Sequence, residues 1–171
     1  MILIVPPGKT PEEEIAYYQA MTNQDPIAIG IQAVSHIDEA LRDLILACVS
    51  YPAAIDKVQF EFSKKCALAV ALGLDIRFLA PLQRLGKIRN DIAHKTGATI
   101  SALDVKTLSS TLAGQEKDLI RRLWLMTLGK RQELDGTEDI DMLSPIDHFV
   151  LIAVTLRGIV VAERMRRARS M

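Results

Sequence analysis

Apolar residues recur at three- and four-residue spacing along most of this chain, which is the pattern of amphipathic helices. The clearest example begins at Asp25-Pro26, where an aspartate suited to an N-cap precedes a proline suited to the first helical position. This helix is expected to end near Ser50, because Tyr51-Pro52 follows. Its predicted buried stripe consists of Ile37, Leu41, Leu44, Ile45 and Cys48.

Start and stop signals divide the rest of the chain into further helices. Gly73 is suited to the position just beyond a helix C-terminus, and Pro81 predicts a tight turn over residues 75–79 before the next helix. Ser101 and Ser144 are suited to N-caps. The predicted helices cover residues 11–23, 26–50, 55–72, 80–95, 102–112, 115–128 and 145–169.

These elements predict an all-α fold, a single-domain helical bundle of about six to seven helices. The chain has 171 residues, which suits one domain that can bury a core. We expect residues 1–10 to form an N-terminal extension and residues 11–171 to form the bundle. Residues 129–142 are polar and predict a loop, which contains an acidic stretch at residues 133–141.

The formal net charge is zero, from 21 basic and 21 acidic residues. The chain therefore lacks the broad positive field that attracts proteins to DNA. A local basic patch is the alternative, and arginines do gather near the C-terminus: Arg164, Arg166, Arg167 and Arg169. We favour the simpler interpretation, in which they complement the dipole at a helix end.

We expect a cytoplasmic protein with no membrane segment. Residues 1–5 are too short for the apolar part of a signal peptide and have no basic lead. The longest apolar stretch, residues 149–162, is interrupted by Arg157 and is too short to span a bilayer. Cys48 and Cys66 lie in apolar helical patterns, which predicts buried, inert thiols in a reducing compartment.

Three motifs suggest a ligand, and we retain none of them. Gly8-Lys9-Thr10 lacks the upstream glycine of a phosphate-binding loop, because Leu3 stands at that position. A metal site at His36 would need a second ligand four residues on, where Ala40 stands. His148 has no paired ligand either. We therefore expect no metal and no cofactor.

The densest group of reactive side chains is the run Arg-Asn-Asp-Ile-Ala-His at residues 89–94. On a regular helix Asn90 and His94 are neighbours that can touch, whereas Arg89 is offset from His94 around the axis. The residues alone leave two interpretations open. Lys87 could pair with the acid four residues on, and His94 could complement the helix dipole. Alternatively, the group is a functional site.

The same six residues resemble the Arg-(four residues)-His signature of the HEPN superfamily of helical domains. With the residues before them, the stretches 62–74 and 82–94 more closely resemble the mannitol operon repressor family. That family has a similar Lys-x-x-Leu-Ala-x-Ala-Leu-Gly-Leu helix before an Ile-Arg-Asn-Asp-Phe-Ala-His segment. The helix around residues 36–41 fits the preceding core helix, so the resemblance covers about the middle half of the chain. Ile92 replaces the usual Phe and Cys66 is also a departure, but both are apolar.

The closer resemblance implies a non-enzymatic regulatory protein. Like the mannitol operon repressor, it would modulate transcription, or another complex, through protein contacts. It would act as a homodimer or with a partner protein. The sequence has no evident helix-turn-helix element, which agrees with contact to proteins rather than to DNA.

The superfamily resemblance implies an alternative, a metal-independent, toxin-like endoribonuclease whose partner would be an antitoxin. His94 would be the general acid/base, Arg89 would stabilise charge on the phosphorane oxygens, and Asn90 would orient the imidazole or donate to phosphate. Two copies of the motif would meet across a dimer cleft that holds RNA. We favour the regulator, because few cations accompany the motif: Arg84, Lys87, Arg89 and Lys95.

Overall fold

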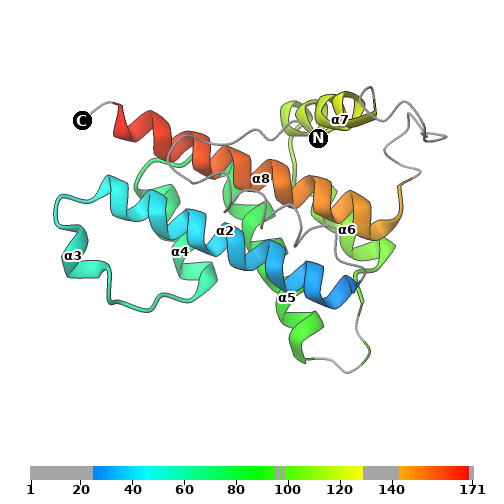
Figure 1. The fold of residues 1–171 in the computed structure, drawn as a ribbon, viewed down its shortest axis with the longest axis horizontal. Helices are drawn as coiled ribbons and strands as arrows, with labels where there is room; N and C mark the ends of the chain where they lie inside the picture. Colours follow the sequence, from blue (N-terminus) through cyan, green and yellow to red (C-terminus); the bar gives the residue numbers. More distant parts are fainter. Residues whose placement is uncertain (1–24, 95–96, 98, 129–142, 170–171) are drawn as a thin grey trace.

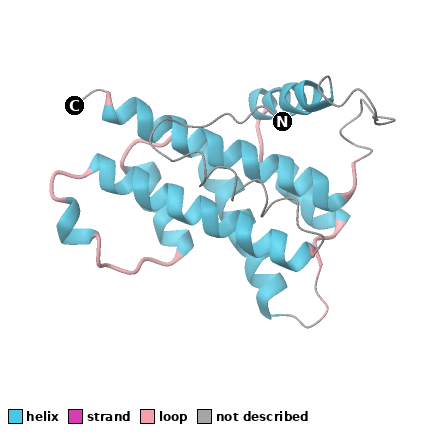
Figure 2. Cartoon of the chain, in the orientation of Figure 1, coloured by secondary structure: helices cyan, strands magenta, loops and turns pink. Residues whose placement is uncertain are grey.

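The computed structural model describes residues 25–94, 97, 99–128 and 143–169, and every regular element among them is helical (Figure 1 and Figure 2). The elements are α2 (Pro26–Cys48), α3 (Pro52–Ile55), α4 (Phe62–Ala71), the 3-10 helix η1 (Ile76–Phe78), α5 (Leu79–His94), α6 (Ala102–Ser110), α7 (Gly114–Leu128) and α8 (Pro145–Ala168). In the described part of the chain, these seven α-helices pack in one body, so the predicted all-α bundle is confirmed.

The two long helices α2 and α8 form the centre of the bundle, lying side by side and running in the same direction (Figure 1). Both begin at the predicted caps. Asp25 Oδ1 accepts a 2.9 Å hydrogen bond from the Ile27 amide, and Ser144 Oγ accepts a 3.2 Å bond from the Asp147 amide. Helices α4 and α5 pack against α2, so the core lies among these four helices.

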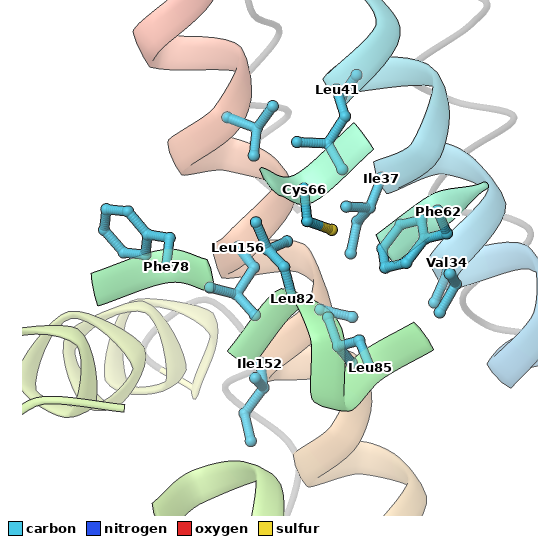
Figure 3. Close-up of a cluster of buried hydrophobic side chains, with 14 of the residues drawn as sticks. Val34, Ile37, Leu41, Phe62, Cys66, Phe78, Leu82, Leu85, Ile152 and Leu156 are labelled. Carbon is cyan, nitrogen blue, oxygen red and sulfur yellow. The ribbon is translucent and has the colours of Figure 1, made fainter. Parts of the chain in front are cut away.

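Figure 3 shows the centre of that core, where buried side chains of α2, α4, α5 and α8 meet around Cys66. The labelled members from these helices are Val34, Ile37, Leu41, Phe62, Cys66, Leu82, Leu85, Ile152 and Leu156. Burial raises the pKa of the Cys66 thiol to about 12, because a thiolate is poorly solvated there. The predicted burial is confirmed for Cys66, whereas Cys48 at the end of α2 is only half-buried.

The predicted helix over residues 55–72 is wrong in its first part. The short helix α3 ends at Ile55, and α4 does not begin until Phe62. The reason lies in the burial pattern. Phe62, Cys66 and Ala69 are buried at helical spacing, whereas residues 56–59 are exposed and offer no face to the core.

Several other predicted boundaries agree with the structure. Gly73 follows α4 with a φ of 108°, a left-handed conformation that favours glycine after a helix. Ser101 caps α6, and its partner in a reciprocal capping box is Asp104. The predicted extension at residues 1–10, the helix at 11–23 and the loop at 129–142 lie outside the described residues.

Helix α8 bears on the expectation that no segment crosses a membrane. Among the described residues it is the one helix long and apolar enough to span a bilayer, with a mean hydropathy of 1.7 over its most apolar window. Of that window, 44% is buried inside the bundle, and core helices of soluble proteins pass the same test. The helix extends beyond the apolar stretch at residues 149–162, so the expected absence of a membrane segment stays a prediction.

Candidate functional site

The candidate motif occupies the C-terminal end of α5, whose start is set by the turn before it. Asp75 Oδ1 accepts a 3.0 Å hydrogen bond from the Arg77 amide and so caps η1. Helix α5 then begins at Leu79, and Pro81 falls in its first turn, where a missing amide hydrogen is tolerated. The tight turn predicted at residues 75–79 is therefore confirmed as a 3-10 turn.

Two close approaches fix α5 against its neighbours. Gly86 lies so near α4 that an added Cβ would come within 2.6 Å of the Phe62 ring. Gly30 of α2 lies equally near the end of α5, since a Cβ there would be 2.7 Å from Ile92 Cδ1. The C-terminal turn that carries the motif is thus seated on α2 through Ile92, which is buried.

The opposite side of α5 faces outward. Four polar residues, here called the outer stripe, follow one another at three- and four-residue spacing and are all exposed: Gln83, Lys87, Asn90 and His94. The predicted placement of Asn90 and His94 on one face is confirmed. Their side chains can present an amide and an imidazole to an approaching partner.

Arg89 does not share that face. Five residues at about 100° each separate its direction from that of His94 by about 140° around a regular helix. Arg89 is half-buried, in line with Leu85 on the packed side, while His94 is exposed. In the described part of the chain, no side-chain hydrogen bond joins Arg89, Asn90 and His94 to one another. One copy of the chain therefore does not assemble an Arg–His pair.

The cations near the motif are fewer than the sequence suggests. Arg84 Nη2 donates to Asp104 Oδ1 at 3.0 Å, an ion pair between α5 and α6 in which both side chains are largely buried. Asp104 also accepts from the Ser101 amide and hydroxyl in the capping box. Arg84 is thus committed to holding the two helices together, a role that no local sequence signal distinguishes from a surface arginine. Lys95 lies outside the described residues.

Two hollows lie away from the motif. One, of about 600 Å³, lies between α2 and the segment that joins α3 to α4, and its lining includes the ion-paired Arg42 and Asp56. The other, here called the α7–α8 hollow, has a volume of about 720 Å³ and lies among η1, α7 and α8. Neither is lined by Arg89, Asn90 or His94. Sequence reasoning missed both hollows, because residues distant in the chain form them.

The other predicted polar residues take no part in a recognisable centre. His36 and His148 are half-buried and both engage other groups. Within the described residues, no three His, Cys, Asp or Glu side chains gather in a group that could hold a metal ion.

At the end of α8, Arg166 and Arg167 both donate to the Glu163 carboxylate, at 2.6 Å and 2.8 Å. These two arginines thus pair with a carboxylate near the C-terminal end of α8. Arg167 Nη2 also donates to the Gly73 carbonyl at 3.1 Å.

In comparisons with protein-family models, curated proteins and solved structures, no match to this chain is found. The resemblance to the mannitol operon repressor family and to the HEPN superfamily therefore rests on the residues quoted above and stays a prediction.

Proposed function

We propose that this protein is a non-enzymatic regulator that works through protein contacts, in the manner that its resemblance to the mannitol operon repressor implies. It would act in the cytoplasm on transcription, as a homodimer or with a partner protein. The observation that supports this proposal best is the outer stripe of α5. Its four side chains are exposed, rich in hydrogen-bonding groups and backed by a helix fixed to the core.

The outer stripe has the character of a contact surface rather than of an enclosed reaction site. A binding face needs accessible donors and acceptors on a rigid element, which α5 provides. An active site gains from a concave setting that excludes water, and neither hollow includes the stripe. The zero net charge also favours a protein partner over a nucleic acid.

The ribonuclease alternative keeps one supporting observation, the exposure of Asn90 and His94 on a common face. In such a reaction the imidazole of His94 would accept the proton of an RNA 2′-hydroxyl while the 2′-oxygen attacks phosphorus. The 5′-oxygen would leave and take a proton from a general acid, such as His94 of the second copy. Arg89 of one copy would have to approach His94 of the other, because the two diverge by about 140° on a single helix.

The two functions separate in one assay. Wild type, His94→Ala and Arg89→Ala are incubated with a mixed RNA pool in the presence of a metal chelator, with Lys117→Ala, at an exposed position of α7, as the matched control. We expect a folded wild type to leave the RNA intact. Cleavage that His94→Ala and Arg89→Ala abolish and Lys117→Ala retains would contradict the regulatory proposal.

Regulation is tested directly by genome-wide transcript levels in cells that lack the gene. Re-expression of wild type should restore the levels of the affected transcripts. A variant with Gln83, Lys87 and Asn90 all changed to Ala should not restore them, because it removes three of the four side chains of the outer stripe and leaves the core face intact. Lys106→Ala, exposed on α6, is the control and should behave as wild type. Full rescue by the triple variant would argue against the stripe as the contact surface.

A further inference from the structure

The α7–α8 hollow contains a charged side chain whose hydrogen-bonding capacity is not filled. Glu116, in the first turn of α7, is only 5% exposed, and it lines the hollow. Its Oε1 lies 3.3 Å from Arg77 Nη1, but its Oε2 is buried and has no hydrogen-bond partner. A buried carboxylate oxygen without a donor is unfavourable, so this position favours a ligand that brings an N–H or O–H group.

The arginines around the same hollow are engaged to different degrees. Arg77 is held by Asp75, Gln115 and Glu116. Arg166, also in the lining, is held by Glu163. Among the described residues, no ion pair or hydrogen bond engages Arg122, six residues beyond Glu116 on α7. A guanidinium group in this state can bind a phosphate through two parallel hydrogen bonds.

The rest of the lining gives the hollow an apolar wall. Leu119 of α7 and Ile159 of α8 are half-buried, and Ile76 of η1 is 66% exposed. A volume of about 720 Å³ falls within the range of small-molecule sites. The hollow therefore combines a hydrogen-bond acceptor, an available cation and apolar surface on three different elements.

We propose that the α7–α8 hollow binds a small phosphorylated metabolite that carries hydrogen-bond donors. The phosphate meets Arg122, and an N–H or O–H group of the ligand donates to Glu116. Rotation about the last side-chain torsion exchanges the two carboxylate oxygens, so either oxygen can serve once Arg77 holds the other. Two sources share this chemistry, a nucleoside monophosphate with a donor edge and a sugar phosphate. This inference goes beyond the proposed function and does not depend on it.

Isothermal titration calorimetry of the full chain tests the proposal with three probes: guanosine monophosphate, glucose 6-phosphate and inorganic phosphate. We expect one of the two organic phosphates to bind with a submillimolar Kd, and at least tenfold more tightly than inorganic phosphate. Binding of the first identifies a nucleotide site and binding of the second a sugar-phosphate site. Failure of both to bind, or equal binding of inorganic phosphate, would overturn the proposal.

Matched variants locate the site. Arg122→Gln and Glu116→Gln should each weaken binding at least tenfold. Lys117→Gln and Asp118→Asn are exposed neighbours on α7 outside the lining, and they should stay within twofold of wild type. Arg122 is itself exposed, so Arg122→Gln tests the site even if Glu116→Gln fails to fold by circular dichroism. Equal affinity of Arg122→Gln and Lys117→Gln would place any binding elsewhere.

Discussion

The outer stripe of α5 and the α7–α8 hollow are opposite kinds of candidate site. The stripe comes from one helix, is exposed throughout and could be found from the spacing of its residues. The hollow comes from three elements, contains a buried carboxylate and has no signature in the sequence. Polar groups exposed on one helix can thus be predicted from their spacing, whereas a buried carboxylate with an unpaired oxygen is seen only in the packed structure.

The first prediction contrasts the two faces of α5. The outer stripe is available as a contact surface only if its side chains contribute little to the stability of the fold. Ile88→Ala removes a side chain that is 1% exposed and should lower the free energy of unfolding by about 2–5 kcal/mol. Lys87→Ala on the outer stripe should change it by less than about 0.5 kcal/mol. Urea unfolding measures both, and equal effects would remove the distinction between the faces.

The second prediction contrasts two arginines of the hollow. Arg77→Ala leaves the buried Glu116 carboxylate without its cation and should cost about 1–3 kcal/mol of unfolding free energy. Arg122→Ala should change stability by less than about 0.5 kcal/mol, because Arg122 is exposed. Guanidinium denaturation provides the values. A large loss in Arg122→Ala would mean that this arginine is structural rather than available to a ligand.

The third prediction concerns the support of the stripe by α6. Ser101→Ala removes half of the capping box that also positions Asp104 against Arg84, and should cost about 1 kcal/mol. Thr99→Ala, exposed just before the helix, is the control and should be nearly neutral. Thermal unfolding compares the two. An unchanged melting temperature in Ser101→Ala would show that the cap does not hold α6 to α5.

The smallest predicted effect concerns pH at the rim of the hollow. Hydrogen bonds from Arg166, and then from Arg167, lower the pKa of Glu163 below its ordinary 4.5. The contribution of the ionised Glu163 carboxylate to stability is therefore fully present above its unfolded-state pKa. This contribution is lost as the pH falls through the lower folded-state pKa. Glu163→Gln should cost at most about 1 kcal/mol at neutral pH, and less at acid pH. Unfolding curves from pH 7 to pH 3 test this prediction. A difference in unfolding free energy between wild type and Glu163→Gln that does not change with pH would show that the charge of the Glu163 carboxylate does not stabilise the fold.

The sequence predicted what depends on local spacing. The caps at Asp25, Ser101 and Ser144 follow from short-range hydrogen bonding, and the buried faces follow from helical periodicity. The break between α3 and α4 could not be predicted this way, because Ile55 and Phe62 both suit a helix and only the packing separates them.

The two candidate sites differ in the same way, since one depends on local spacing and the other on packing between distant segments. The placement of Asn90 and His94 on one face of a helix followed from their four-residue spacing. The burial of Glu116 did not, since an acid in the first turn of a helix is ordinarily a solvated partner of the dipole. Its setting is created by η1 and α8, which are far away in the chain.

The pairing of α2 with α8 has a consequence for synthesis. Arg164 and Asp43 form an ion pair across 121 positions of sequence, and the core face of α2 is covered by the last described helix to be made. While the ribosome builds the chain, α4 and α5 can pack on α2 as they emerge, but the part of α2 that faces α8 stays uncovered until α8 is made. Contacts between such distant segments slow folding and prolong exposure to aggregation. The nascent chain therefore exposes an apolar face of α2 until α8 has emerged.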